Sequence, residues 1–372
     1  MSAPEVRVVD PRAVPSGRRR LGAYIELTKP RIIELLLVTT VPAMIVAARG
    51  WPDTWLVVAT LVGGALSAGG ANAINNVVDR DIDEVMHRTR GRPLPSARIE
   101  PSAALAFGIS LGVAGFGWLW ATANLPAAAL STGGLLFYVV VYTLGLKRTS
   151  PQNIVIGGAA GSVPALVGWA AVTGSLAAPA WVMFAIVFFW TPPHFWALAL
   201  RYKDDYAAAG VPMLPVVAGT PFTLAQIETF GVVLFGVSLL LYPTGAVGVV
   251  YLAGAVVLGG WLLAAGHKLG GDGGEAMRFF GLSNVYLASM FALMALDVVI
   301  VEAGDGGRFS PEWLQRPVLV VASVVIAAGL IVTAGRELSA PDRSNVNRVR
   351  AAFEVLLPVA ATAFLVAWLW TG

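Results

Sequence analysis

The sequence has no cysteine among its 372 residues and only three histidines. The lack of cysteine excludes disulfides, thiolate nucleophiles and thiolate metal sites. Charged residues are also scarce, at 13% of the chain, against about 25% in an average soluble domain. The sequence carries no nucleic-acid-binding motif, and its basic residues are spread over several loops rather than gathered in one patch. These shortages argue against a large soluble domain and against nucleic acid as a partner.

Apolar sequence is abundant instead. Hydrophobic residues make up 57% of the chain, and the mean hydropathy is +0.73. Apolar runs long enough to cross a bilayer as helices recur from end to end, so we expect an all-α polytopic membrane protein. We place the spans at 32–48, 55–75, 103–123, 127–146, 154–173, 178–200, 222–242, 246–266, 280–301, 317–335 and 351–371.

The distribution of lysine and arginine predicts the orientation of these spans. Alternate loops hold only Arg49, Arg308 and Arg316. The other basic residues concentrate before the first span and in the loops at 79–102, 147–148, 201–220, 267–278 and 336–350. Because basic loops stay in the cytoplasm, we expect the N-terminus and the acid-rich loops inside and the C-terminus outside, in the cell membrane.

One stretch combines acids, an amide and arginines at the end of an apolar run. Asn75, Asp79 and Asp83 follow one another at four-residue intervals, which on a helix places them on one face. Such oxygen ligands suit Mg²⁺, which is usually held by a few carboxylates together with substrate phosphates. Arg88 and Arg92 follow, and guanidinium groups bind phosphate oxygens well. The alternative is a charged loop whose acids and arginines pair with each other.

A second charged cluster follows the span 178–200. It comprises Arg201, Lys203, Asp204 and Asp205. The predicted orientation puts it on the same membrane face as the first acidic stretch, and side chains on facing helices of a bundle can converge on one cation. An ordinary charged loop is the alternative. Lys147 and Arg148 close the fourth span on that same face, where they are placed to meet a phosphate.

His194 follows two consecutive prolines near the polar end of the span 178–200. We expect Pro192 and Pro193 to break or kink the helix there, which opens a cavity and frees backbone carbonyls. An ionisable residue at membrane depth is a candidate for function. His194 therefore either contacts a ligand in that cavity or is a hydrogen-bonded packing residue.

Together these features favour a metal–diphosphate site in front of an apolar bundle. The oxygens would hold Mg²⁺, the basic residues would neutralise a diphosphate, and the bundle would enclose a hydrocarbon tail. This arrangement favours loss of diphosphate from an allylic isoprenoid, in a cavity that keeps water from the resulting carbocation. The sequence offers no Ser/His/Asp or Cys/His arrangement for nucleophilic catalysis.

The motifs themselves resemble a known family. DRDID at 79–83 with RPLP at 92–95 resembles the first aspartate motif of the intramembrane aromatic prenyltransferases. TPPHFWALAL at 191–200, LKRT at 146–149 and NIVIGG at 153–158 narrow the resemblance to the protohaem IX farnesyltransferases, or haem O synthases. The resemblance implies nine helices around a central cavity. It also implies that farnesyl diphosphate alkylates a vinyl group of protohaem IX (haem b), and that water then adds.

The resemblance assigns roles to individual residues. Asn75, Asp79 and Asp83 correspond to the first Mg²⁺–diphosphate motif, and Asp205 with Asp204 to the second; Asp79, Asp83 and Asp205 are the expected catalytic acids. The family's second motif has two acids four residues apart, whereas Arg201 stands four residues before Asp205 here. The expected diphosphate ligands are Arg88, Arg92, Lys147, Arg148, Arg201 and Lys203. His194 is expected to contact haem through its iron or a propionate.

The resemblance also sets the expected domain plan. Residues 1–23 are polar and lack the apolar core of a secretory signal, so we expect a flexible cytoplasmic arm. Residues 24–302 would form the nine-helix domain, embedded in membrane lipid. Residues 303–372 would add two transmembrane helices, which either pack against the bundle or dock a partner such as haem A synthase or a terminal oxidase.

Two alternatives remain at this point. One is a related prenyltransferase that acts on 4-hydroxybenzoate or a naphthoate, which would need a smaller acceptor pocket. The other is a secondary transporter, which would be built from inverted repeats with charges near the midplane. The acids of this chain lie at the membrane boundary and no internal repeat is evident, so the sequence favours the enzyme.

Overall fold

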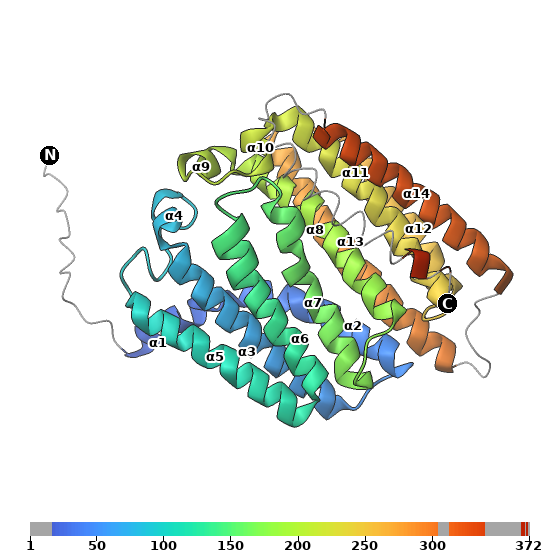
Figure 1. Cartoon of the computed structure of the whole chain (residues 1–372), viewed down its shortest axis with the longest axis horizontal. Helices are drawn as coiled ribbons and strands as arrows, with labels where there is room; N and C mark the ends of the chain where they lie inside the picture. The colour runs from blue at the N-terminus through green and yellow to red at the C-terminus, as the bar shows by residue number, and fades with distance from the viewer. Residues whose placement is uncertain (1–16, 304–311, 339–365, 369, 371–372) are drawn as a thin grey trace, which may run out of the picture.

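The computed structural model describes residues 17–303, 312–338, 366–368 and 370, which form a bundle of long helices (Figure 1). Within these residues nine helical segments are long and apolar enough to cross a membrane, and a shorter apolar stretch lies at Val38–Ala48. The chain is therefore an integral, multi-pass membrane protein. The last predicted span, 351–371, lies almost wholly outside the described residues.

Helices occupy the other predicted spans. They are α2 (Pro30–Ala48), α3 (Thr54–Val78), α5 (Pro101–Thr122), α6 (Leu125–Leu136) continued by η1 (Phe137–Leu146), α7 (Asn153–Thr173), α8 (Ala178–Arg201), α11 (Gly219–Leu239), α12 (Val249–His267), α13 (Gly273–Ala303) and α14 (Glu312–Leu338). Shorter helices lie between or before them: α1 (Gly17–Leu27), α4 (Arg80–Val85), α9 (Lys203–Ala208), α10 (Leu214–Val217) and η2 (Tyr242–Thr244).

Helix α1 corrects one expectation about the N-terminal arm. It begins at Gly17, inside the stretch predicted to be flexible. Its residues Ala23 and Leu27 are fully buried against Ala73 of α3 and Ile99 of the following loop. Removing these two side chains from water and lipid ties α1 to the bundle, so the predicted arm is wrong from residue 17 onward.

Helix α3, which ends at the acidic stretch, is held against α5 by glycines. A Cβ added at Gly70 would lie 2.6 Å from the carbonyl oxygen of Gly108, and one at Gly115 would lie 3.0 Å from the backbone nitrogen of Ser67. Only small residues allow backbones to approach this closely, and such contacts drive helix association in lipid. The close α3–α5 contact fixes the direction in which α3 delivers its C-terminal polar residues.

Helix α8 corrects a second expectation. Pro192 and Pro193 lie inside it, yet the helix runs without a break from Ala178 to Arg201. Prolines are tolerated inside membrane helices when neighbouring groups satisfy the freed carbonyls. Because α8 is also the most deeply buried span, tertiary packing supports it on every side.

Helix α14 packs along α11 at the edge of the bundle opposite α5 (Figure 1). The two helices meet at glycines: a Cβ added at Gly236 would lie 2.8 Å from Ile326, and one at Gly329 would lie 2.5 Å from Val233. Arg336 donates to the backbone oxygen of Ala225 at the end of this contact. The first of the two added C-terminal helices is thus a packed part of the bundle.

Candidate functional site

The first acidic stretch does not lie on one continuous helix, as the spacing had suggested. Helix α3 ends at Val78, Asp79 caps it, and Asp83 lies on the separate helix α4. The backbone nitrogens of Asp79 and Asp83 nevertheless donate to the carbonyls of Asn75 and Asp79, at 2.9 and 2.8 Å. These i→i−4 bonds keep the three side chains at the same end of the bundle despite the interruption.

Asp79 is fully buried and its carboxylate is surrounded by donors. Its Oδ2 accepts a hydrogen bond from Asn75 Nδ2 at 2.7 Å and forms an ion pair with Lys147. Its Oδ1 has no hydrogen-bond partner among the described residues. A buried carboxylate oxygen without a partner is costly, and an oxygen of this kind fits a hard cation such as Mg²⁺.

Asp83 is 2% exposed and is paired with Arg92. Arg92 Nη1 lies 2.9 Å from Oδ1 and 2.7 Å from Oδ2 of the Asp83 carboxylate. Thr89 supports the loop between them by donating to the Asp83 carbonyl at 3.1 Å. Buried pairs of this kind hold both side chains in fixed positions, because leaving either charge alone in the interior is unfavourable.

Lys29 belongs to the same cluster, although it stands 46 residues before Asn75 in the sequence. Its Nζ donates to Asn75 Oδ1 at 2.7 Å. The left-handed backbone of Lys29, with φ of 53° just before Pro30, turns the chain into α2 at this point. Burial, together with the neighbouring cations Arg92 and Lys147, lowers the pKa of Lys29 to about 7. A lysine directly before a proline at a helix start was the only signal in the sequence.

Arg148 and Asp81 form a separate pair outside this cluster. Arg148 donates to both carboxylate oxygens of Asp81, at 2.7 and 2.6 Å, and to the carbonyl of Val78 at 2.8 Å. The hydrogen bonds from Arg148 lower the pKa of the Asp81 carboxyl to about 2. Both side chains are partly exposed, so Arg148 lies at the rim of the site, and diphosphate binding by Arg148 stays a prediction.

The loop after α8 meets the loop of the first acidic stretch. Ile82 and Met86 are buried against Val211 and Met213, and α4 and α9 lie at the same end of the bundle (Figure 1). Arg88 connects the two loops, since its guanidinium lies 5.3 Å from the ring centre of Tyr202. The two charged loops therefore do come together in space.

The acids of the second cluster are less engaged than those of the first. Asp205 is half-buried and Asp204 is exposed, as is Arg201, while Lys203 is half-buried. Across the described ranges, no three His, Asp or Glu side chains lie close enough to hold one metal ion. The loops meet, but the structure does not place Asp204 and Asp205 in one ligand set with Asp79 and Asp83.

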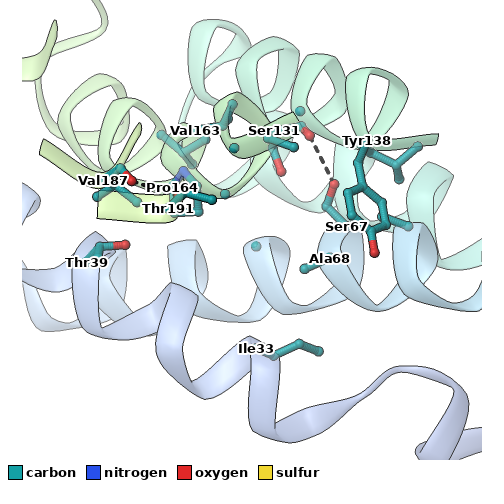
Figure 2. Close-up of a pocket in the computed structure, with 18 of the residues that line it drawn as sticks. Ile33, Thr39, Ser67, Ala68, Ser131, Tyr138, Val163, Pro164, Val187 and Thr191 are labelled. Atoms are coloured by element: carbon teal, nitrogen blue, oxygen red, sulfur yellow. Dashed lines mark hydrogen bonds between the residues drawn. The ribbon is translucent and has the colours of Figure 1, made fainter. Parts of the chain in front are cut away.

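A cavity of about 280 Å³ extends into the bundle beneath the acidic cluster. Residues of α2, α3, α6, η1, α7 and α8 line it, most of them apolar or small, together with Leu287 of α13. Tyr138 and Tyr142 line the end nearest Asp79, with ring centres 5.4 Å apart. Figure 2 shows Tyr138 at one end of the pocket and Thr39, Val187 and Thr191 at the other. The shape and lining suit an extended hydrocarbon chain.

The segment η1 is a π-helix, and it supplies three of the site's side chains. Lys147 N donates to the Tyr142 carbonyl at 2.8 Å, and Thr143 Oγ1 donates to the Tyr138 carbonyl at 2.8 Å, both across five residues. Asn75 Nδ2 in turn donates to Thr143 Oγ1 at 3.1 Å. Departures of this kind from α-helical geometry are frequent at functional sites. Here the wider turn brings Thr143 and Lys147 to the acidic cluster.

His194 lies away from the cavity lining. It is 3% exposed, and its ring stacks between Trp190 and Phe280, with ring centres 4.2 and 4.1 Å away. Its Nδ1 lies 2.8 Å from Ser283 Oγ. The structure thus describes the packing arrangement that the sequence left open as one of two alternatives, and contact with haem stays a prediction.

The chain matches the UbiA prenyltransferase family over residues 36–289. It is 52% identical over 301 residues to a protohaem IX farnesyltransferase of Parafrankia sp. (strain EAN1pec), covering 78% of this chain and 96% of that protein. It is 54% identical over 282 residues to protohaem IX farnesyltransferase 2 of Saccharopolyspora erythraea, covering 74% of this chain and 86% of that protein. Helix α14 lies beyond the region matched to the family.

Among solved structures, the chain is similar to a digeranylgeranylglyceryl phosphate synthase, with a TM-score of 0.63 and 18% identity. The similarity covers 76% of this chain and 99% of that one. At this identity the likeness concerns the fold alone.

Proposed function

The chain belongs to the UbiA prenyltransferase family, and from that premise we propose that it transfers a farnesyl group from farnesyl diphosphate to a vinyl group of protohaem IX, with addition of water, to give haem O. The acceptor and the donor are inferred from relatives that are about half identical over most of their length. The motif residues that led to the same resemblance, 79–83 and 191–200, stand in the two loops and the span that form the site.

One observation supports the reaction class more than any other. Asp79 has a buried carboxylate oxygen that no other described residue contacts by a hydrogen bond, and it lies beside three basic side chains at the mouth of a largely apolar cavity. The basic residues are Lys29, Arg92 and Lys147. A charged head group and a long hydrocarbon tail are the two parts of a prenyl diphosphate, and each has its matching surface here.

A bound Mg²⁺ would supply charge stabilisation for the departing diphosphate. We propose that Asp79 and Asp83 hold it, with further ligands from the diphosphate and water, as Mg²⁺ usually takes few protein ligands. Asn75 positions Asp79 through Nδ2 while its Oδ1 accepts from Lys29. Asp205 and Asp204 would approach the same diphosphate from the second loop.

The basic residues would interact both with the carboxylates and with the diphosphate leaving group. Lys147 and Arg92 pair with Asp79 and Asp83, and we propose that both turn part of their charge to a bound diphosphate. Arg88, held over Tyr202, and Lys29 add positive charge on the other sides. Positive charge already in place where negative charge develops lowers the barrier to departure.

The cavity wall accounts for protection of the carbocation. Tyr138 and Tyr142 line the cavity at the end nearest Asp79, and an aromatic face is attracted to positive charge. Most of the remaining lining residues are apolar or small and exclude bulk water, so the vinyl π-electrons of protohaem meet the allylic cation before water does. Water then captures the cation formed next to the porphyrin.

We further propose the orientation in the cell membrane. The N-terminus and the acidic loops lie in the cytoplasm and the C-terminus outside, because the basic residues border the acidic end of the bundle. Helix α14 packs on α11 through glycines, which supports a packing role for it. Haem A synthase or a terminal oxidase would be candidate partners for the remaining C-terminal residues.

Mass analysis of extracted haem tests this function. Purified protein in detergent is incubated with protohaem IX, farnesyl diphosphate and Mg²⁺, and we expect a product heavier by one farnesyl group and one hydroxyl group, because the captured water loses a proton. Reactions without Mg²⁺, and with 4-hydroxybenzoate in place of protohaem, are the controls. A prenylated 4-hydroxybenzoate with unmodified haem would refute the proposed acceptor, while keeping the reaction class.

A further inference from the structure

The cavity is longer than its proposed substrate requires. Along α3 its lining residues are Thr60, Gly64, Ser67, Ala68, Ala71 and Asn72, on one face of the helix that ends at Asp79. With a rise of about 1.5 Å per residue, the line from Asp79 measures about 18 Å to Ser67, about 22 Å to Gly64 and about 28 Å to Thr60. The lining itself extends about 18 Å along α3, from Asn72 to Thr60.

The length of a prenyl chain can be compared with this line. With carbon–carbon bonds of about 1.5 Å, an extended chain of three isoprene units measures about 14 Å and one of four units about 19 Å. A diphosphate stands between Asp79 and the first carbon. The end of a three-unit chain then falls near Ser67, and the end of a four-unit chain falls near Gly64.

Gly64 leaves the deeper part of the cavity open. A Cβ added at Gly64 would have no heavy atom within 4 Å, whereas one added at the neighbouring Gly63 would lie 2.4 Å from Leu119. Gly63 is thus a packing glycine, and Gly64 faces the cavity. Beyond it, Thr60 is 1% exposed and its Oγ1 has no hydrogen-bond partner within the described residues. The cavity, with the Thr60 hydroxyl in its wall, therefore extends beyond the point that a three-unit chain reaches.

We propose that the protein accepts prenyl diphosphates of four isoprene units as well as three, and that Gly64 is the residue that admits the longer chain. The inference rests on the proposed function for the reaction, and it adds the length limit of the donor. A side chain at position 64 would occupy the space of the fourth unit and leave the first three in place.

Gly161 gives a second position at a different depth. It lines the cavity, and a Cβ added there would also have no heavy atom within 4 Å. Helix α7 starts level with α4, since Ile154 packs with Ile82. Gly161 is seven residues further along, about 10 Å into the bundle. A side chain at Gly161 would therefore obstruct the path of both chains.

The test compares the use of farnesyl and geranylgeranyl diphosphate by the full-length protein with protohaem IX and Mg²⁺. In the natural protein we expect the two values of kcat/KM to agree within about tenfold. Gly64→Leu should lower the value for the four-unit donor about a hundredfold relative to the three-unit donor, and Gly64→Ala should have a smaller effect in the same direction. Gly161→Leu should lower both values, and Gly260→Leu, an exposed mid-helix glycine of α12 with similar free space, should lower neither.

A binding measurement separates this inference from the proposed function. Each diphosphate with Mg²⁺ and without protohaem should raise the melting temperature of the natural protein, and Gly64→Leu should lose the shift caused by the four-unit compound only. If neither diphosphate alkylates haem, the proposed function fails while these shifts still test the cavity. Rejection of the four-unit diphosphate by the natural protein, or an unchanged preference in Gly64→Leu, would overturn the inference.

Discussion

Asp79 and Asp297 are both fully buried carboxylates in a membrane protein, and they are satisfied in opposite ways. Asp297 accepts backbone hydrogen bonds on both oxygens, from Gly248 at 2.5 Å and from Tyr251 at 3.0 Å, and so caps the first turn of α12. Asp79 crowds Lys147 and Asn75 onto one oxygen and leaves the other without a partner among the described residues.

The contrast separates structural from functional burial. The carboxylate of Asp297 is complete within the protein, because backbone donors at a helix start suit a negative charge. The carboxylate of Asp79, in contrast, has no donor for its Oδ1 within the part of the chain that the structure describes. Burial of an acid inside a membrane is thus a weak indicator of function. A stronger indicator is whether both of its carboxylate oxygens accept hydrogen bonds from the protein.

Of the substitutions that test this contrast, Asp79→Asn should reduce turnover the most. We expect turnover of farnesyl diphosphate to fall by about a thousandfold or more, because the substitution removes a charge that the site uses in the transition state. The protein should still insert and melt as a single species, since the amide keeps the size of the side chain. Turnover in the purified variant close to that of the natural protein would show that Asp79 has no role in the reaction.

Arg92→Lys tests whether Asp83, like Asp79, has a role in the reaction rather than in stability alone. Lysine keeps the charge but replaces the planar guanidinium, whose Nη1 contacts both Asp83 oxygens, by a compact ammonium group. We expect kcat/KM for farnesyl diphosphate to fall about a hundredfold, measured by haem product at varied donor concentration. Arg98→Lys is the matched control, because Arg98 pairs with Glu26 at the surface. Equal losses in the two variants would contradict a specific role for Arg92.

Asp297→Ala should affect stability and leave the chemistry alone. Losing an acceptor at a helix start costs about 1–2 kcal/mol, so the melting temperature in detergent should fall. Activity per folded molecule should stay within about twofold of the natural protein. A variant that melts normally but has lost turnover would show that Asp297, like Asp79, takes part in the reaction, and would contradict its purely structural role.

Lys29 should have no effect beyond donor binding, and that effect depends on pH. Because its pKa lies at about 7 in the folded protein, its charge is present below that pH and is lost above it. KM for farnesyl diphosphate should therefore rise above pH 7, by up to about tenfold per pH unit. In Lys29→Arg, whose charge persists, this rise should be absent. A KM profile of the same shape in both proteins would remove Lys29 from diphosphate binding.

The same pKa shift has a defined sign for stability. Between pH 7 and about 10.5 the unfolded chain keeps the Lys29 proton and the folded chain does not. Stability therefore rises with pH across this window, as far as Lys29 contributes.

The sequence could predict the helices and the first acidic stretch because both are local patterns. Apolar runs of fixed length identify spans, and Asp79 and Asp83 stand four residues apart in a polar segment. The same local logic wrongly allowed a break at Pro192 and Pro193, where α8 is continuous and most of its side chains are buried. It also failed for α1, which is helical because Ala23 and Leu27 find buried partners far along the chain.

The rest of the site depends on contacts between distant segments. Lys29 reaches Asn75 across 46 positions and Lys147 reaches Asp79 across 68. The capping role of Asp297 similarly requires the start of α12 to lie beside the end of α13. No periodicity in one segment encodes such pairings, so the basic side of the site emerges only from the packed bundle.

The π-helical stretch at Phe137–Leu146 also bears on which insertions and deletions the chain tolerates. A π-turn stores one surplus residue inside an otherwise regular helix. After loss of one residue there, the segment could form ordinary α-helical hydrogen bonds. The span would therefore stay helical, but the Lys147 side chain would point in a different direction. The stretch from Gly70 to Asn75 of α3 has no π-helical turn that could absorb a deletion. Loss of one residue there would rotate Asp79 by about 100° around the helix axis. Variation in length near the site should therefore collect in the former segment and be absent from the latter.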